Sequence, residues 1–315
     1  VAGAGARLAD IESMLAAEGQ RLPFEPMDHR PLLGSAGEPT LGGVVACNVS
    51  GPRRIQAGAC RDSLIGVRFV DGRGTVVKNG GRVMKNVTGY DLVKLMAGAF
   101  GTLGILTELS FKLLPIPQAQ ATVVLSGLPD ERAIAALSAG LGSPYDVTGA
   151  AHIGGETLLR LEGFAESVAY RADRLRAALA DFGDARIEMG DAAGRWRAVR
   201  DVLPFAERPG AVWRLSLKPS DGPRAVAAIA PEDAIYDWGG GLVWLLVREG
   251  ADADVAAIRD VVGRLGGHAT LIRAQQATRR AVAPFHPQAA AVERLSAALR
   301  AKFDPCGVLN PGIMT

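Results

Sequence analysis

The feature that most constrains this chain is the stretch Gly98-Ala-Phe-Gly101-Thr-Leu-Gly104, in which glycine returns at every third position. Glycine loses more backbone entropy on folding than any other residue, so this spacing disfavours a regular helix. A fold accepts that cost where the chain needs positive φ, or where a ligand or another backbone approaches closely. The stretch therefore predicts a tight turn with exposed amides, which is either a ligand cradle or a plain connection.

The segments on either side of this turn have different periodicities. Residues 91–96 carry four apolar side chains behind Asp91, which predicts a short helix. Residues 105–114 alternate in part and predict a strand that enters a core. The expected unit is a helix, a glycine turn and a strand.

Composition limits the classes of protein to which the chain can belong. The 315 residues are 48% hydrophobic and 22% charged with a net charge of +2, a profile that gives no electrostatic footprint for nucleic acid. No apolar run approaches the roughly 18 residues of a membrane-spanning helix. The three cysteines, Cys47, Cys60 and Cys306, form no CxxC pair. We expect reduced thiols in a cytoplasmic protein and no metal cluster built from cysteine.

Two further stretches in the first third predict local structure. Thr40 precedes the pair Gly42-Gly43 and a small apolar run, a pattern typical of a helix start that either binds an anion or packs closely in a turn. Residues 63–77 contain two β-rich runs around Asp71-Gly72, which predicts a hairpin.

Residues 118–285 have a different rhythm, with strands and helices in turn. Helices are expected over 168–182 and 255–265, each ending at glycine. This pattern predicts an α+β module in which an antiparallel sheet carries helices on one face, and no sequence repeat is apparent. The expected strands cover 122–125, 157–161, 186–189, 213–217, 235–238, 242–247 and 268–273.

The last thirty residues predict a helix and a docked tail. Residues 288–302 place apolar side chains on one stripe, and Phe303 continues it. The tail Asp304-Pro-Cys-Gly-Val-Leu-Asn310-Pro-Gly312 is rich in turn residues, and we expect it to rest on another part of the protein.

Taken together, five segments in a fixed order resemble the FAD-binding family of the vanillyl-alcohol-oxidase type, also called the PCMH-type fold. Within it, phrases such as MKNVTGYDL and DWGGGLVWL are most similar to the FAD-binding subunits of glycolate oxidases. The five segments are TLGGVVACN (40–48), RDSLIGVRFVDGRG (61–74), KNVTGYDL (85–92), GAFGTLGILTE (98–108) and FDPCGVLNPG (303–312).

The resemblance implies an α+β fold with three parts. Residues 1–117 are expected to form the second part of a PCMH-type FAD-binding domain, 118–285 an antiparallel-sheet cap domain, and 286–315 a helix and tail that return to the FAD domain. In the family a βα unit with its own glycine-rich loop precedes these segments. The chain is expected to begin after that loop, as an N-terminally truncated member.

The resemblance also implies which residues hold FAD. Gly42, Gly43 and the amides after them are expected at the pyrophosphate or ribityl chain, and Asn310 near the isoalloxazine. The remaining expected cofactor residues are Thr40, Asn48, Gly98, Gly101, Thr102, Gly104 and Ile105, of which the last four meet the adenylate half. Lys85 and Asn86 are expected to hold the preceding loop, and Tyr90 to be buried with its hydroxyl group bonded.

Related 2-hydroxy-acid dehydrogenases use a histidine-rich metal site in the cap. The four histidines of this chain show no ligand spacing, so we predict no metal site. His268 and Arg273 are the candidate catalytic residues, although a strand histidine satisfied by backbone is the alternative for His268. Arg214 is a candidate for binding a carboxylate or, alternatively, for a cross-strand ion pair.

By resemblance, the expected function is that of an FAD-binding subunit in a glycolate oxidase complex, acting in the oxidation of glycolate to glyoxylate. The implied partners are a catalytic flavoprotein subunit and an iron–sulfur subunit, and the implied location is cytoplasmic, with membrane association through those partners. Two alternatives remain open: a non-catalytic FAD-binding assembly subunit, and a stand-alone FAD-dependent dehydrogenase for a 2-hydroxy acid such as D-lactate.

Overall fold

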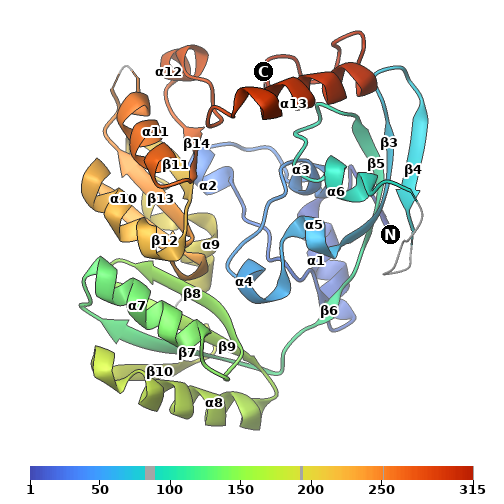
Figure 1. The fold of residues 1–315 in the computed structure, drawn as a ribbon. Helices are drawn as coiled ribbons and strands as arrows, with labels where there is room; N and C mark the ends of the chain where they lie inside the picture. The colour runs from blue at the N-terminus through green and yellow to red at the C-terminus, as the bar shows by residue number, and fades with distance from the viewer. Residues whose placement is uncertain (82–88, 192–193, 251, 315) are drawn as a thin grey trace. The chain divides into compact units, whose positions relative to one another are not determined.

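The protein divides into two compact units in a computed structural model that describes residues 1–81, 89–191, 194–250 and 252–314 (Figure 1). Unit 1 comprises Val1–Met27, Ala36–Ile116 and Pro287–Thr315, and unit 2 comprises Asp28–Ser35 and Pro117–His286. The segment Asp28–Ser35 lies inside the range 1–117 expected for the first domain, yet it belongs to unit 2.

Unit 1 is built on an antiparallel sheet with the strand order β1-β5-β3-β4. Strands β3 (Leu64–Val70) and β4 (Val76–Gly80) form the hairpin predicted around Asp71-Gly72. Strand β5 (Ile105–Phe111), which follows the glycine turn, pairs with β3, and the short β1 (Ala2–Gly3) pairs with β5. The glycine turn is therefore anchored directly to the centre of this sheet.

Helices cover the apolar core of unit 1. Helix α1 (Leu8–Ala17) contributes Leu8, and the short helices α3 (Leu41–Ala46) and α6 (Leu92–Met96) contribute most of their apolar side chains. These side chains pack with Phe24, Phe69 and Leu109, which are fully buried. The remaining elements of this unit are β2 (Gln20–Arg21), α4 (Arg54–Ala57), α5 (Cys60–Ser63) and β6 (Leu114–Pro115).

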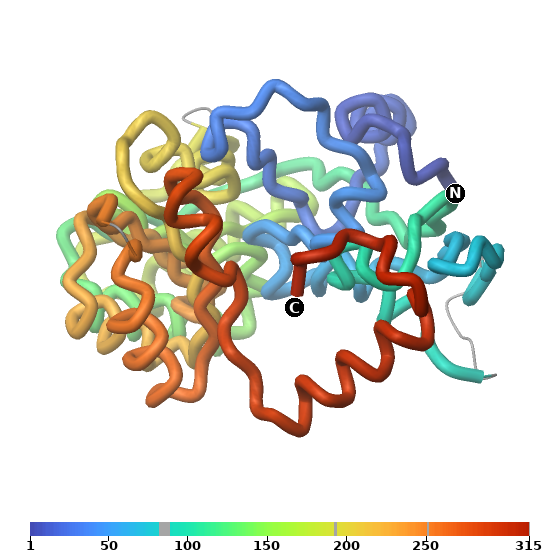
Figure 2. The backbone as a smooth tube through the Cα atoms, turned by 90° about the horizontal axis from the view of Figure 1, so that it is seen from above, coloured from blue at the N-terminus to red at the C-terminus, as the bar shows by residue number. Residues whose placement is uncertain are grey.

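The C-terminal helix α13 (Ala290–Phe303) ends against the β3–β4 hairpin, as the red tube in Figure 2 shows. The Phe303 carbonyl oxygen accepts a hydrogen bond of 2.8 Å from the Gly72 amide, and the Phe303 ring lies 6.1 Å from that of Phe69. Beyond the helix, the Asp304 carboxylate accepts from the Val308 and Leu309 amides, at 3.1 and 2.7 Å. The predicted docking of the tail is thus seen within unit 1.

Unit 2 is organised around one antiparallel sheet with the strand order β10-β7-β9-β8-β12-β13-β11-β14. Strands β13 (Leu242–Val247) and β14 (His268–Arg273) have the bounds that their apolar runs predict. The other strands are β7 (Ala119–Ser126), β8 (Val147–Ile153), β9 (Glu156–Gly163), β10 (Ala185–Met189), β11 (Ala211–Ser216) and β12 (Asp233–Asp237).

This sheet contains a topological repeat that the sequence does not reveal. The order β7-α7-β8-β9-α8-β10 is a βαββαβ unit, with α7 at Asp130–Leu141 and α8 at Ala165–Ala178. The order β11-α10-β12-β13-α11-β14 is a second one, with α10 at Gly222–Ile229 and α11 at Val255–Arg264. In each half the strands lie in the order fourth, first, third, second, which is the ferredoxin-like arrangement. The halves meet where β8 pairs with β12, through His152 and Tyr236.

Helices lie on both faces of the sheet. Tyr236 contacts Asp130 at the start of α7 (Asp130–Leu141) and lies next to Gly222 at the start of α10 (Gly222–Ile229), so both helices cover the same face. Leu158 packs with Trp196 of α9 (Arg195–Asp201), whereas its neighbour Leu159 faces α7. Successive strand residues point to opposite faces, so α9 lies on the face opposite to α7. The expectation that helices cover only one face of this sheet is therefore wrong. Other helical elements are α2 (Arg30–Leu33), α8 (Ala165–Ala178), α11 (Val255–Arg264) and α12 (Gln276–Ala281).

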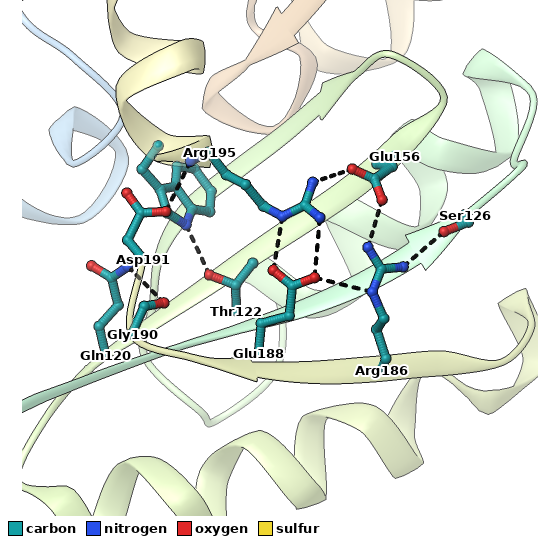
Figure 3. Close-up of polar contacts among 10 residues, drawn as sticks. Gln120, Thr122, Ser126, Glu156, Arg186, Glu188, Gly190, Asp191 and Arg195 are labelled. Atoms are coloured by element: carbon teal, nitrogen blue, oxygen red, sulfur yellow. Dashed lines mark hydrogen bonds and ion pairs between the residues drawn. The ribbon is translucent and has the colours of Figure 1, made fainter. Parts of the chain in front are cut away.

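An ion-pair ring fastens the beginning of α9 to the sheet (Figure 3). Arg195 binds the Glu188 carboxylate through two nitrogens, at 2.8 and 3.1 Å, and also pairs with Glu156. Arg186 closes the ring by donating to Glu188 at 3.0 Å and to Glu156 at 2.5 Å. Hydrogen bonds from Arg195 and Arg186 lower the pKa of Glu188, so the ring stays ionised at neutral pH.

Candidate functional site

The first of the predicted cofactor residues lie at the start of helix α3. Thr40 caps the N-terminus of this helix. The Thr40 backbone is extended, and its side-chain hydroxyl oxygen accepts a hydrogen bond of 3.2 Å from the Gly43 amide. The next amides are taken by the first turn of the chain: Leu41 donates to the Ala6 carbonyl at 2.9 Å, and Gly42 to the Ala4 carbonyl at 2.7 Å. Helix α3 is therefore capped from inside the protein.

Gly42 and Gly43 differ in what surrounds them. A Cβ at Gly42 would lie 2.9 Å from the Ala4 carbonyl oxygen, so Gly42 is required for the close approach of two backbones. Gly43 is exposed, and a Cβ there would touch only the Thr40 hydroxyl at 3.4 Å. Gly43 therefore offers bare, open backbone to a ligand, whereas Gly42 serves packing.

The glycine turn lies beside the end of α3. The Gly98 amide donates to the Val45 carbonyl at 3.0 Å, and the Phe100 amide to the Ala46 carbonyl at 2.8 Å. Gly98, Phe100 and Gly101 have φ of +89°, +52° and +71°. This run of positive φ explains the glycine spacing, because L-residues rarely adopt that conformation.

The second half of the turn is shaped by packing. The buried Thr102 donates its hydroxyl proton to the Ala99 carbonyl at 2.7 Å. A Cβ at Gly104 would lie 2.6 Å from the Phe69 ring. Ile105 is 62% exposed at the start of β5, so it is the residue of this half with a side chain open to a ligand.

Two asparagines complete the group. Asn48 has φ +49° and its side-chain oxygen accepts from the Arg61 amide at 2.9 Å, while a Cβ at Gly98 would lie 3.4 Å from the Asn48 Cβ. Asn310, in the tail, donates its side-chain amide to the Phe100 carbonyl at 2.6 Å. The end of α3, the glycine turn and the tail therefore meet within unit 1.

This arrangement fits a flavin nucleotide through its bare backbone. Open glycine at Gly43 and the positive-φ turn permit close approach of a large planar or anionic group, and Asn310 and Asn48 add amide groups at the edges. The amides of Gly42 and Gly43 already donate hydrogen bonds within the protein. They are therefore not available to bind the pyrophosphate, although the sequence had led us to expect that contact.

The segment before the glycine turn gives one correction. Tyr90 is 88% exposed, so the prediction that it is buried with its hydroxyl group bonded is wrong. Its neighbour Asp91 caps α6 by accepting from the Lys94 amide at 3.1 Å, and this places Tyr90 outside the helix. Lys85 and Asn86 lie outside the described residues.

His268, one of the two predicted catalytic residues, is exposed at the start of β14 in unit 2. Its ring stands edge-on to that of His286, with centroids 5.9 Å apart. Burial lowers the pKa of His286, and electrostatic interactions with His268 and Arg259 lower it further. His286 is therefore largely uncharged at neutral pH.

Arg273, the other predicted catalytic residue, is bound to backbone carbonyls of unit 2. Its Nε donates to Gly210 at 3.2 Å and its Nη2 to Arg208 at 2.7 Å. Its Nη1 donates to Phe205 at 2.7 Å, with longer contacts to Ala206 and Leu32. A guanidinium has five N–H donors, and this one directs them to main-chain oxygens, so its geometry is that of a residue that holds loops.

Arg214, the candidate for binding a carboxylate, packs against an aromatic side chain of unit 2. The Arg214 guanidinium lies 5.2 Å from the centre of the Trp238 ring, and Trp238 and Trp244 are buried. No group of three or more metal-ligating side chains occurs among the described residues. Among the residues that the structure describes in both units, no helix is both long and apolar enough to span a bilayer.

Comparison with known sequences places these features among flavoproteins. Residues 1–80 match the family model described as FAD binding domain. The chain is 37% identical to glycolate oxidase subunit GlcE of Escherichia coli (strain K12) over 312 residues, which are 98% of this chain and 80% of GlcE. It is 41% identical to glycolate oxidase subunit GlcD of Bacillus subtilis (strain 168) over 85 residues, 27% of this chain and 18% of GlcD.

Comparison with solved structures supports the same fold. A structure of alkyldihydroxyacetonephosphate synthase matches 98% of this chain and 64% of its own length, with a TM-score of 0.65 and 16% identity. The chain thus spans less than two thirds of that protein. The expected α+β fold, with a PCMH-type FAD-binding domain and an antiparallel-sheet cap, is confirmed.

Proposed function

The chain belongs to the GlcE family of glycolate oxidase subunits, and from that premise we propose that it is the FAD-binding subunit of a glycolate oxidase complex. In that complex it takes part in the flavin-dependent oxidation of glycolate to glyoxylate. The observation that carries the proposal is the likeness to GlcE across 98% of the chain. The meeting of α3, the glycine turn and Asn310 in unit 1 gives the proposal a site.

FAD is the cofactor, in keeping with the FAD binding domain matched by residues 1–80. When bound, FAD supplies the two-electron redox chemistry, and the protein supplies position and electrostatics. In our proposal Gly43, Gly98 and Gly101 present bare backbone to the nucleotide, and Ile105 packs beside it. Thr40, Gly42, Thr102 and Gly104 keep that surface in shape through the internal contacts described above.

The proposed partners are a catalytic flavoprotein subunit and an iron–sulfur subunit. Support for a partner subunit comes from the names of the relatives, since GlcE and GlcD are both named as subunits of glycolate oxidase. We place the complex in the cytoplasm, with any membrane association arising through the partners. The proposed substrate is glycolate or a similar 2-hydroxy acid.

A second candidate function is a non-catalytic FAD-binding assembly subunit. The geometry of Arg273 favours it, because a guanidinium bound to carbonyls of unit 2 has little capacity left for a substrate carboxylate. His268 then remains as the candidate of unit 2 with an exposed titratable side chain.

Substitution of Gly43 within the assembled complex separates the two functions. Gly43→Leu fills the open space at the proposed FAD surface, and Gly37→Leu is the control, because Gly37 is also exposed with nothing within 4 Å of an added Cβ. The full-length protein is co-expressed with both partners, and flavin content and glycolate-dependent dye reduction are measured. We expect Gly43→Leu, and not Gly37→Leu, to lose one flavin and glycolate oxidation.

The outcomes differ for each candidate. Loss of the flavin with an intact complex and unchanged glycolate oxidation would support the assembly role. A complex of the two partners that oxidises glycolate at full rate without this chain would contradict the proposed function.

A further inference from the structure

The segment Asp28–Ser35 leaves unit 1, is held by unit 2 and returns to unit 1. Residues up to Met27 and from Ala36 onward belong to unit 1, whereas the segment between them belongs to unit 2. We call this segment the strap. Its centre is the single helical turn α2, in which Leu32 is 1% exposed. Connecting segments usually run over the surface, so the burial of Leu32 indicates that the strap is held at a fixed place.

The first hold on the strap is Asp201. Its side chain is 1% exposed, and its Oδ1 accepts from the Asp28 amide at 2.9 Å. Asp201 is itself held by the Arg200 guanidinium through two hydrogen bonds, at 2.8 and 2.7 Å. The Asp28 carboxylate turns back to Arg30 in the strap. Burial acts to raise the pKa of this carboxylate, and the hydrogen bonds from Arg30 bring it below its ordinary value. Buried charges of this kind persist when they are paired and hydrogen-bonded.

The second hold is Arg273. Its Nη1 donates to the Leu32 carbonyl in the strap at 3.2 Å and to the Phe205 carbonyl at 2.7 Å. Its other nitrogens fix the carbonyls of Arg208 and Gly210. One planar guanidinium therefore joins the strap to residues 201–210, which we call the seat. A lysine has a single ammonium and no planar fork, so it does not replace this spread of contacts.

We propose that the strap couples the FAD-binding unit to the cap, with Asp201 and Arg273 as the positioning residues that hold it. Without the strap the chain passes between the units at residues 116–117 and 286–287. The strap adds the passages at 27–28 and 35–36. Any movement of unit 2 relative to unit 1 must then carry the strap along, stretch its ends or break the bonds to Asp201 and Arg273. This proposal does not depend on the identity of the substrate.

Hydrogen–deuterium exchange of the full-length protein tests the hold. Arg273→Met removes the guanidinium, Arg273→Lys keeps the charge, and Arg248→Met is the control, since Arg248 is an exposed arginine of unit 2 that pairs with Glu232. We expect exchange in peptides covering 28–35 to rise about tenfold in Arg273→Met, in line with the loss of a hydrogen bond to a charged group, and less in Arg273→Lys. Exchange in β8 and in the control stays unchanged.

Equal acceleration across all of unit 2 would mean general destabilisation and would overturn the proposal, as would unchanged exchange in the strap. If Arg273→Met does not fold, Leu32→Ala provides the same test from the strap side, because it removes the buried anchor and leaves the seat carbonyls paired.

The coupling itself is measured by a spin-label distance between the units. Cysteines replace Met14 in α1 and Tyr170 in α8, both exposed, in a background with serine at Cys47 and Cys306. We expect the distance distribution to broaden in Arg273→Met and not in Arg248→Met. A distribution that Arg273→Met leaves unchanged, although strap exchange rises, would show that the strap does not couple the units.

Discussion

The side-chain amide of Asn310 donates a hydrogen bond of 2.6 Å to the main-chain carbonyl oxygen of Phe100, which lies 210 positions earlier in the chain. Phe100 stands at positive φ between Gly98 and Gly101, and its own amide is bonded to α3. One asparagine thus ties the tail to the glycine turn and, through it, to the helix that carries Gly43. The three segments that the sequence singles out for FAD are connected by this contact.

Asn310→Ala should weaken FAD binding with little effect on folding. The lost hydrogen bond is worth about 0.5–1.5 kcal/mol, so the FAD Kd is expected to rise up to about tenfold. Flavin fluorescence quenching on the full-length protein measures this Kd. Asn79→Ala is the control, because Asn79 makes a similar side-chain bond to the Tyr90 carbonyl in the same unit. Equal Kd values for Asn310→Ala and the wild type would count against the site.

Gly101→Ala should disturb the same junction by a different route. An added Cβ would lie 2.8 Å from the Asn310 Nδ2, and alanine is strained at φ +71°. Gly74→Ala is the matched control, since Gly74 has φ +80° and an added Cβ there would have nothing within 4 Å. Both variants should lose about 1 kcal/mol of stability from the strained backbone. Only Gly101→Ala should also lose flavin content, and equal flavin content in the two would refute this reading.

The buried pair Arg160–Glu162 offers a test of the cap. Arg160 is fully buried, its Nε lies 3.8 Å from the Glu162 carboxylate, and its guanidinium lies 4.4 Å from the Trp196 ring. Arg160→Met leaves the Glu162 charge buried, so urea unfolding should show a loss of about 3–5 kcal/mol. The double variant Arg160→Met/Glu162→Leu should recover much of that loss. A double variant as unstable as the single one would show that the pair is not the cause.

The buried His152 predicts that the cap loses stability in mild acid. Burial lowers the pKa of His152 below its ordinary value of 6.5, and the Asp130 carboxylate opposes this in part. The unfolded chain therefore binds the proton more tightly, and stability is present above pH 6.5 and lost as the pH falls below it. His152→Gln, which can still bond to Thr157, should show a smaller fall in Tm between about pH 7.5 and about pH 5. An equal fall in both proteins would exclude His152, since His286 remains in each.

The strands with continuous apolar runs were predictable, and those built from small residues were not. Residues 242–247 form β13 with the expected bounds, because a run buried on both faces reads as a strand. Strand β8, Val147–Ile153, carries little such signal. Its Gly149 is small because the Trp196 ring passes over it, and a Cβ there would lie 2.7 Å from that ring.

The site was predictable as a set of segments and not as a set of roles. Glycine at Gly43 leaves open space, glycine at Gly42 and Gly104 admits a neighbouring backbone or ring, and glycine at Gly101 supplies positive φ. All of these needs remove the same Cβ, so the sequence alone cannot separate them. The same holds for Arg273, whose charge suggests a substrate contact while its bonds go to distant carbonyls.

Photo-crosslinking with an azido-adenine analogue of FAD tests the central claim most directly. The full-length protein is illuminated with the analogue, and the labelled peptides are identified by mass spectrometry, with excess FAD as competitor. We predict labels that FAD suppresses in peptides covering 98–105, the segment assigned to the adenylate half. Labels that FAD suppresses only in unit 2 or in the β3–β4 hairpin would contradict the assignment of the flavin site to α3, the glycine turn and the tail.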